Sequence, residues 1–265
     1  MTAVGIIPAR LASSRLPRKL LLDATGQPLI QHTWEAARRA RSLADVIVAT
    51  DSDEIAAAVR RFGGRAERTG EHSSGTDRIA EVVRRGILRT DVIVNIQGDE
   101  PEIDPSHIDC LVETLLAHPQ AETATLATPI RSLHDLNAPS CVKVVCAADG
   151  RALYFSRAPI PHVRDAEPQA ILAQFAATEH RTKNDTPLTT PWLLHLGLYA
   201  YRREFLLKLT ERPPSRLEQW EKLEQLRVLE AGATMQVAVV DHRSVGIDTP
   251  DDYVQFVARV SARAA

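Results

Sequence analysis

The chain has 265 residues, of which 44% are hydrophobic and 25% charged, and it carries a formal net charge of −2. These values are typical of a globular α/β protein, and the basic residues do not cluster as a nucleic-acid-binding surface requires. No apolar run reaches the roughly 18 residues of a membrane span, and the first residues lack a signal-peptide pattern. The three cysteines lack metal-ligand spacing. We therefore expect a cytoplasmic protein that neither enters a membrane nor binds nucleic acid.

The first half of the chain alternates predicted strands and helices. Short apolar runs rich in β-branched residues predict strands, and apolar residues at helical spacing predict the helices between them. The expected strands are Ala3–Pro8, Asp45–Thr50, Arg65–Thr69 and Val92–Ile96, and the expected helices are Pro28–Ala40, Asp51–Phe62 and Ile79–Gly86. This alternation predicts right-handed βαβ units and a mostly parallel sheet.

The second half is less regular. After a helix at Pro105–Ala117 and a strand at Thr123–Pro129, an Asp-Gly turn between Val142–Cys146 and Ala152–Ser156 predicts a hairpin. We interpret residues 164–191 as an exposed insertion with a short helix at Pro168–Ala177. The remaining expected elements are strands Leu193–Tyr201 and Met235–Val240 and helices Ser215–Ala231 and Asp251–Arg263. Helical spacing assigns Trp34, Trp220 and the leucines of the helix Ser215–Ala231 to the core.

A carboxylate follows the most apolar strand of the chain. Val92–Ile96 runs into Gln97-Gly98-Asp99-Glu100-Pro101, so Asp99 lies just past the carboxyl end of a buried strand. In open α/β sheets ligands bind at this edge, and a carboxylate there is a natural ligand of Mg²⁺. A turn aspartate without a ligand is the alternative, and this segment alone does not exclude it.

Four cations follow the first strand. Arg10, Arg15, Arg18 and Lys19 lie within the loop Ala9–Lys19, where backbone amides and mobile cations can form a cradle for a polyphosphate. The loop matches neither the Walker A pattern nor the dinucleotide-binding G-x-G-x-x-G pattern. A solvated basic loop is the alternative, but so many cations directly after a buried strand favour anion binding.

A further polar segment, His72–Arg78, precedes the predicted helix Ile79–Gly86. Its Ser, Gly and Thr residues either cap that helix or form a shallow bed where main-chain groups contact a planar base. The sequence leaves both interpretations open.

Motifs along nearly the whole chain resemble one enzyme family. IIPARLASSRLPRK, VATD, HSSGTDRIAEV, VNIQGDEP, ALYFSRAPIP, HLGLYAY and GIDTPDD follow in the order and spacing of the 3-deoxy-manno-octulosonate cytidylyltransferases, the CMP-Kdo synthetases of lipopolysaccharide biosynthesis. The resemblance implies a nucleotide-diphospho-sugar transferase-like α/β sandwich with a mostly parallel central sheet and a smaller sugar-binding and dimerisation lobe. It also implies a single domain over residues 1–265, with a CTP-binding portion at about 1–130, a sugar-binding and dimer portion at about 131–245 and a closing helix at 249–263.

The same resemblance implies the reaction and its residues. The family transfers CMP from CTP to the anomeric hydroxyl of an acidic eight-carbon sugar and releases pyrophosphate, and its members are Mg²⁺-dependent cytosolic homodimers. Asp99 and Asp248 match the metal-binding carboxylates, which act in catalysis together with Arg15 and Lys19. The nucleotide-binding positions are Arg10, Arg15, Lys19, Ser74, Gly75, Arg78 and Gln97. The sugar-binding positions are Gln97, Arg157, His195, Tyr199, Glu218 and Gln225.

Two of these positions have ordinary structural alternatives, and one loop departs from the family. Asp248 could cap the helix that follows Thr249-Pro250, and His195 could be a core histidine. Arg18 replaces a glycine of the family's phosphate loop; if that glycine has a positive φ, Arg18 is strained and should gain a contact, which we expect to be a phosphate. The sugar stays open between Kdo and another acidic sugar, such as 8-amino-Kdo or a nonulosonate. A catalytically weak nucleotide-binding regulator is the rival outside the enzymes.

Overall fold

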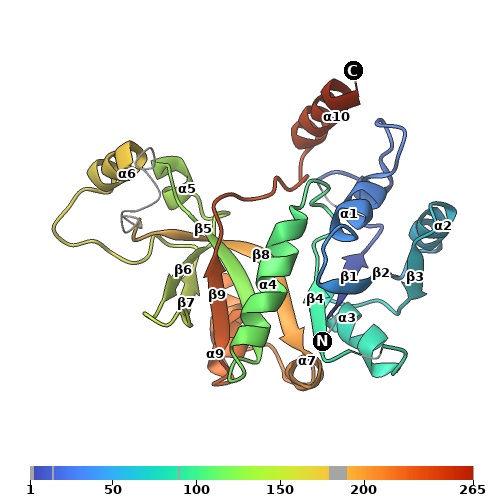
Figure 1. The fold of residues 1–265 in the computed structure, drawn as a ribbon, viewed down its shortest axis with the longest axis horizontal. Helices are drawn as coiled ribbons and strands as arrows, with labels where there is room; N and C mark the ends of the chain where they lie inside the picture. The colour runs from blue at the N-terminus through green and yellow to red at the C-terminus, as the bar shows by residue number, and fades with distance from the viewer. Residues whose placement is uncertain (1–2, 14, 89, 179–189, 265) are drawn as a thin grey trace. The chain divides into compact units, whose positions relative to one another are not determined.

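The structure, a computed structural model, describes all residues except 1–2, 14, 89, 179–189 and 265 (Figure 1). The chain divides into two compact units, and both are discontinuous in sequence. The first comprises Met1–Ala117, Gly197–Arg212 and Ser244–Ala265, and the second comprises His118–Leu196 and Pro213–Arg243. The continuous portions implied by the family resemblance therefore differ from these units, because two later segments return to the first unit.

The first unit is built on a mostly parallel sheet. Strands β1 (Ala3–Ala9), β2 (Leu43–Thr50), β3 (Arg65–Arg68) and β4 (Val92–Asn95) lie in the order β3-β2-β1-β4, and all three pairs are parallel. The C-terminal half of β8 (Leu193–Arg202) adds an antiparallel strand, in which Tyr199 pairs with Asn95. The central residues Ile6, Ile47 and Ile93 are completely buried. Such continuous burial explains why these strands appear in the sequence as apolar runs and not as alternating patterns.

Helices connect these strands, and serines start two of them. Ser52 precedes α2 (Asp53–Arg61) and accepts a hydrogen bond from the amide of Ile55. α3 (Gly75–Arg84) begins earlier than the predicted Ile79, because Ser74 already caps its first turn. The other helical elements of this unit are η1 (Lys19–Leu21), α1 (Leu29–Ala37), α4 (Pro105–Ala117), α7 (Arg203–Leu209) and α10 (Pro250–Ala264).

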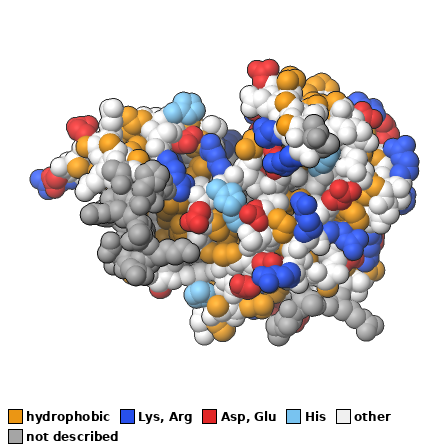
Figure 2. Space-filling view, turned by 45° about the horizontal axis from the view of Figure 1, so that its top comes forward, with side chains coloured by type: hydrophobic (Ala, Val, Ile, Leu, Met, Phe, Trp, Pro, Cys, Tyr) orange, Lys and Arg blue, Asp and Glu red, His pale blue; other side chains and the backbone are white. Residues whose placement is uncertain are grey.

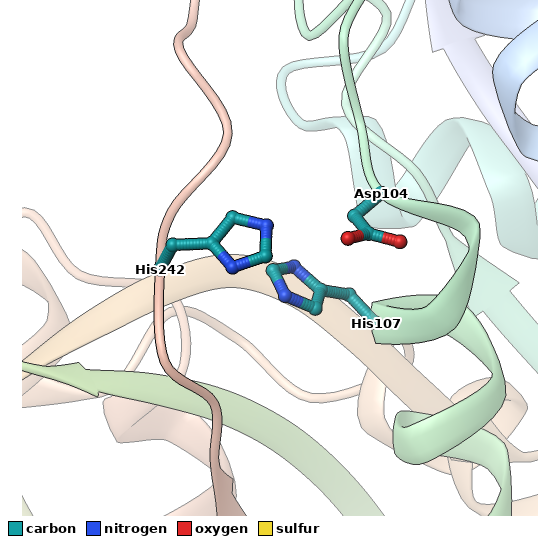
Figure 3. A group of neighbouring side chains, drawn as sticks. All are labelled: Asp104, His107 and His242. Carbon is teal, nitrogen blue, oxygen red and sulfur yellow. The ribbon is translucent and has the colours of Figure 1, made fainter.

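An aspartate starts α4, whose predicted boundaries are confirmed. Asp104 accepts hydrogen bonds from the amide of Ser106 (2.8 Å) and from its hydroxyl (2.7 Å). His107 stands in the same first turn (Figure 3), where its amide donates to the Asp104 carbonyl and its side chain is buried. This local cap explains why α4 begins where it does.

The second unit combines a β-hairpin with short helices. β5 (Thr123–Pro129) pairs in parallel with β9 (Met235–Val239), and β6 (Lys143–Cys146) pairs antiparallel with β7 (Ala152–Ser156) and with the N-terminal half of β8. The predicted hairpin is thus confirmed, and Gly150 in its turn has φ 81°. α5 (Leu133–Asn137) precedes the hairpin, and α6 (Pro168–Thr178) confirms the short helix predicted in the insertion. Residues 179–189 of that insertion lie outside the described residues.

The prediction of a single helix at Ser215–Ala231 is wrong. The structure instead has α8 (Arg216–Glu221) and α9 (Leu226–Glu230). α8 ends because Lys222 adopts the left-handed conformation with φ 54° and ψ 47°, which cannot continue a right-handed helix.

The structure also corrects the core assignment of one tryptophan. Trp220 lies on α8 and is 69% exposed, with the guanidinium of Arg216 placed 4.9 Å from its ring centroid. Trp34 on α1 is buried as predicted.

The surface carries charges of both signs. On the face shown in Figure 2, Lys and Arg side chains alternate with Asp and Glu side chains, and no continuous basic surface covers the described residues of that face. Such mixing agrees with the net charge of −2 and differs from the clustered basic surface of nucleic-acid-binding proteins. Within the described ranges, every helix is too short or too polar to cross a membrane.

One lysine of the second unit is completely buried. Lys143 at the start of β6 has no exposed surface, and its ammonium donates hydrogen bonds to the carbonyls of Ala138 (3.1 Å), Cys141 (2.6 Å) and Arg157 (2.6 Å). Burial lowers the pKa of this ammonium. An ammonium has three hydrogens to donate, so Lys143 can join the end of α5, the loop before β6 and the end of β7.

We expect Lys143→Met to lower the free energy of unfolding by about 3 kcal/mol or more, because three carbonyls lose a donor and each unsatisfied buried group costs about 1–3 kcal/mol. Lys208→Met is the matched control, since Lys208 on α7 is exposed and surface substitutions change stability by about 0.5 kcal/mol at most. Urea unfolding curves measure both variants. Equal small effects would show that the three hydrogen bonds do not stabilise the protein.

Candidate active site

A cavity of about 480 Å³ opens in the first unit. Its walls come from the loop after β1, the segment before α3, the turn after β4 and the segment before α10. All positions predicted for the nucleotide and the metal line it: Arg10, Arg15, Lys19, Ser74, Gly75, Arg78, Gln97, Asp99 and Asp248. The structure thus brings these residues together, while their individual roles stay predictions.

Two carboxylates converge on one lysine in this cavity. The ammonium of Lys19 lies 2.6 Å from Oδ2 of Asp99 and 3.1 Å from Oδ1 of Asp248. A guanidinium nitrogen of Arg15 lies 2.9 Å from the same Asp248 oxygen. Because Lys19 is only 9% exposed, water solvates its charge poorly and the two carboxylates compensate it.

Backbone contacts place Asp99 beside residue 248. Gly98 lets the turn after β4 pass close to β1, where a Cβ would lie 3.2 Å from Cγ2 of Ile7. The hydroxyl of Thr33 on α1 donates to the Gly98 carbonyl (2.9 Å), and the amide of Ile247 donates to the Asp99 carbonyl (2.8 Å). These bonds join the turn after β4 to the segment before α10 and therefore set the two carboxylates side by side.

The side chain of Asp248 does not cap α10. The hydroxyl of Thr249 accepts from the amide of Asp252 (3.2 Å), and the Asp252 carboxylate accepts from the amides of Asp248 (3.1 Å) and Thr249 (2.8 Å). These reciprocal bonds satisfy the first turn of the helix. The carboxylate of Asp248 contacts Lys19 and Arg15 instead, so its interpretation as a helix cap is wrong.

The donor set at this point fits a hard divalent cation. The ammonium of Lys19 lies within reach of both carboxylates, which shows that their oxygens can share one positive charge. Carboxylate oxygens are the protein ligands that Mg²⁺ prefers. The neighbouring Glu100 carries less negative charge at neutral pH than an ordinary glutamate, because burial and the charge of Asp99 raise its pKa to about 7. Asp99 and Asp248 are therefore suited to Mg²⁺, which stays a prediction.

The segment before α3 is both a helix cap and a wall of the cavity. Ser74 accepts a hydrogen bond from the amide of Asp77 (3.1 Å). Gly75 passes close to Pro8, since a Cβ at position 75 would lie 3.1 Å from the proline ring. The two interpretations left open by the sequence are thus compatible, and a larger residue at position 75 would have to displace Pro8.

Two other predicted nucleotide residues have hydrogen-bond partners within the protein. Arg78 is buried, and its guanidinium donates to the carboxylate of Asp51 (2.6 Å) and to the hydroxyl of Thr69 (2.6 Å). The amide of Gln97 donates to the carbonyl of Gly197 on β8 (2.9 Å). Asp51 and Thr69 therefore hold Arg78 in the wall of the cavity, and the neighbouring strand orients Gln97.

His195 and Gln225, both predicted to bind the sugar, lie together in the second unit. Nε2 of His195 is 3.0 Å from the hydroxyl of Thr125, and its Nδ1 is 3.5 Å from the amide nitrogen of Gln225. The ring packs edge-on against Phe155, with centroids 4.9 Å apart. Burial lowers the pKa of His195 to about 3, so the imidazole is neutral in the folded protein at neutral pH.

Arg157 has its donors occupied by backbone carbonyls. Its guanidinium donates to the carbonyls of Glu221 (2.7 Å), Pro139 (2.8 Å) and Lys222 (3.2 Å). In this arrangement Arg157 ties the end of α8 to the loop after α5. Binding a sugar carboxylate would require it to exchange some of these partners, so its predicted role stays a prediction.

The last two predicted sugar residues lie in different units. Glu218 accepts hydrogen bonds from the amide of Ser215 (2.8 Å) and from the guanidinium of Arg227. Tyr199, on the part of β8 that belongs to the first unit, stacks on Tyr201 with centroids 5.8 Å apart. Their contact with a sugar stays a prediction.

Arg18 takes the strained conformation that its position suggested. It has φ 56° and ψ 27°, in the left-handed region. Its guanidinium pairs with the carboxylate of Glu54 at the start of α2, with one N–O distance of 3.3 Å, and lines a separate surface cavity of about 410 Å³. In this structure the guanidinium thus contacts a carboxylate, and the expected contact with a phosphate stays a prediction.

Comparisons with known proteins agree with this fold. A family model described as cytidylyltransferase matches residues 4–237. A solved CMP:2-keto-3-deoxy-manno-octonic acid synthetase complexed with CTP superposes with a TM-score of 0.86 at 39% identity, covering 99% of this chain and all of the other. A cytidylyltransferase from Leptospira borgpetersenii, 17% identical with a TM-score of 0.60, shares the fold. The fold and the family model thus place the chain among the cytidylyltransferases.

More similar relatives identify the family within the cytidylyltransferases. The 3-deoxy-manno-octulosonate cytidylyltransferase of Syntrophobacter fumaroxidans is 48% identical over all of this chain and 99% of its own length. The enzyme of the same name from Rhodopirellula baltica is 47% identical over 99% of this chain and its whole length. The chain belongs to the 3-deoxy-manno-octulosonate cytidylyltransferase family, which confirms the resemblance and the fold class predicted from the sequence.

The strain at Arg18 leads to a stability prediction. Arg18→Gly should raise the free energy of unfolding by about 1 kcal/mol, because glycine adopts this φ without the Cβ penalty of about 1–2 kcal/mol. The exposed pair with Glu54 offsets little of the gain, since such pairs contribute about 0–1 kcal/mol. Arg18→Ala is the control, because it loses the same ion pair but keeps the Cβ. In urea unfolding, the glycine variant should have the highest free energy of unfolding of the three proteins. An alanine variant as stable as the glycine variant would show that position 18 is not strained.

The neutral state of His195 leads to a pH prediction. In the unfolded chain histidine binds a proton near pH 6.5, whereas folded His195 does so only near pH 3. The unfolded state therefore binds more protons between these values, and stability falls as the pH drops below about 6.5, by up to about 1.4 kcal/mol per pH unit.

His195→Gln should flatten this dependence in urea unfolding series between pH 7 and pH 5. The control is His162→Gln, because His162 is exposed in the same unit and its loss should leave the slope unchanged. Parallel curves for all three proteins would show that His195 titrates normally in the folded state.

Proposed function

We propose that this chain transfers the cytidylyl group of CTP to 3-deoxy-D-manno-octulosonate (Kdo) and forms CMP-Kdo and pyrophosphate for lipopolysaccharide biosynthesis. The observation that carries the proposal is the meeting of Lys19, Asp99 and Asp248 in a cavity lined by further cations. Relatives that are 47–48% identical bear the name of this activity, and a solved relative is described in complex with CTP.

The reaction asks the protein mainly for positioning and charge neutralisation. The anomeric hydroxyl oxygen of the sugar forms a bond to the α-phosphorus of CTP and loses its proton. The bond from that phosphorus to the oxygen that bridges to the β-phosphate breaks, and its electrons leave with pyrophosphate. Arg10, Arg15 and Lys19 line the cavity as cations, and they would bind the triphosphate and stabilise the charge that develops on the leaving group.

Asp99 and Asp248 are the residues that would hold Mg²⁺. The ion, when bound, would supply positive charge next to the α-phosphate and lower the pKa of the sugar hydroxyl. The protein itself holds the two carboxylates side by side. The main-chain hydrogen bond from the amide of Ile247 to the carbonyl of Asp99 keeps their two segments together. Assembly as a homodimer is a further part of the proposal, and it rests on the family resemblance.

The activity is tested by measuring pyrophosphate release from CTP and Mg²⁺ with Kdo, 8-amino-Kdo and a nonulosonate in parallel. We expect the highest kcat/KM with Kdo. Faster turnover of another sugar would move the proposal to that substrate. Binding of CTP without pyrophosphate release from any of the three sugars would favour the nucleotide-binding regulator.

Asp99→Asn and Asp248→Asn should each lower kcat by several hundredfold, because removing a group that stabilises charge in the transition state typically costs about 3–4 kcal/mol. Asp251→Asn is the matched control, since Asp251 is an exposed aspartate in the same segment as Asp248 and should keep wild-type kcat. Circular dichroism melting curves establish that the variants fold. A folded Asp248→Asn variant with near-normal turnover would remove that residue from the site.

A further inference from the structure

One histidine that the sequence analysis did not single out also lines the active-site cavity. His72 stands in the segment before α3, and its Nε2 lies 2.6 Å from Oε2 of Glu81 on that helix. The same Glu81 oxygen accepts a hydrogen bond from the amide of Gly70 (2.9 Å), and its other oxygen accepts from the guanidinium of Arg85. Glu81 thus fixes the position of the imidazole at the cavity wall.

These contacts determine which nitrogen of His72 carries a hydrogen. Burial alone would raise the pKa of Glu81, but the hydrogen bonds from His72, Gly70 and Arg85 lower it to about 2. An ionised carboxylate only accepts hydrogen bonds, so Nε2 of His72 must be the donor. In the neutral imidazole, Nδ1 then carries a lone pair and can only accept. Among the described residues, none donates a hydrogen bond to Nδ1.

The charges around the cavity indicate which part of a nucleotide suits the wall that holds His72. The loop after β1 supplies Arg10, Arg15 and Lys19, which suit a triphosphate. The wall before α3 is flanked by acidic groups instead: the carboxylate of Asp77 accepts from the hydroxyl of Ser74 (2.9 Å), and Glu81 holds His72. The cations of the loop after β1 therefore account for the triphosphate, and the uncharged base is the part of the nucleotide left for the wall before α3.

We propose that Nδ1 of His72 accepts a hydrogen bond from the exocyclic 4-amino group of cytosine and thereby selects CTP over UTP. The inference rests on the proposed use of CTP and adds a specificity-determining residue to it. Uracil has a carbonyl oxygen where cytosine has the amino group, so two lone pairs would face each other. The imidazole cannot present its other nitrogen without breaking the bond to Glu81. A site built to pair with a donor discriminates strongly against a ligand that lacks it.

Two substitutions separate reading of the base from support of the loop. In His72→Asn the side-chain amide places a polar atom near the position of Nδ1. The asparagine side chain is too short to donate to Glu81 in place of Nε2. In His72→Gln the amide reaches the position of Nε2 and can still donate to Glu81, but no acceptor remains at the position of Nδ1. Base recognition therefore predicts that the asparagine variant stays selective and the glutamine variant does not. A purely structural role predicts the reverse.

The assay measures kcat/KM for pyrophosphate release with CTP, with UTP and with the triphosphate of pyrimidin-2-one riboside, which lacks the 4-amino group. Kdo is saturating, and the pH is about 8.5 so that an ordinary imidazole is neutral. Turnover of CTP by the wild-type protein tests the proposed function independently of His72. The ratio of CTP to UTP tests the present inference, and His162→Gln, at an exposed histidine of the second unit, is the control substitution.

We expect the wild-type protein to use the pyrimidin-2-one nucleotide about tenfold less well than CTP, equivalent to the loss of one hydrogen bond, and UTP less well still. The CTP to UTP ratio should fall at least about tenfold in His72→Gln and stay within about threefold of wild type in His72→Asn and in His162→Gln. The comparison of the two cytidine-like nucleotides needs no variant, so it holds even if a substitution impairs folding. Equal use of CTP and the pyrimidin-2-one nucleotide by the wild-type protein, or an unchanged ratio in a folded His72→Gln variant, would overturn the inference.

Discussion

The active-site cavity depends on one set of ion pairs, in which the ammonium of Lys19 contacts the carboxylates of both Asp99 and Asp248. Two carboxylates placed this close would repel each other, and a poorly hydrated cation between them converts the repulsion into attraction. Three segments that are remote in sequence meet at this point, namely the loop after β1, the turn after β4 and the segment before α10. The arrangement that fits a divalent cation thus also holds the cavity's walls together.

Two cations of the second unit, the buried Lys143 and the partly exposed Arg157, have a different role. Lys143 and Arg157 each donate to three backbone carbonyls, and together they join the ends of α5, β7 and α8. A cation bound in this way stabilises loops but has few donors left for a ligand. In the first unit, by contrast, Arg15 and Lys19 contact exposed or half-exposed carboxylates that a triphosphate and a metal ion can replace as partners. The two units therefore differ in what their cations contact: backbone carbonyls in the second unit and carboxylates in the first.

The sequence predicted regular elements well wherever local chemistry specified them. The apolar runs of β1, β2 and β4 and the hairpin of β6 and β7 were found, since burial and the Asp-Gly turn leave a direct pattern. The division of Ser215–Ala231 into two helices was missed, because leucines continue at helical spacing across Lys222 and a lysine gives no signal of a left-handed residue. The exposure of Trp220 was missed as well, because helical spacing with those leucines predicted its burial.

By itself the sequence determined the strands and helices that connect them in the first half of the chain, the family, and the nucleotide and metal positions, all of which line the cavity. Only the tertiary structure decided which partner each charged group takes: Asp248 contacts Lys19 and leaves the cap to Thr249 and Asp252, while Arg18 contacts Glu54. The physical reason is that a helix cap or a turn depends on residues a few positions apart. The partner of a charged side chain depends on which distant segments pack side by side, and residues 19 and 248 carry no local pattern that records their contact.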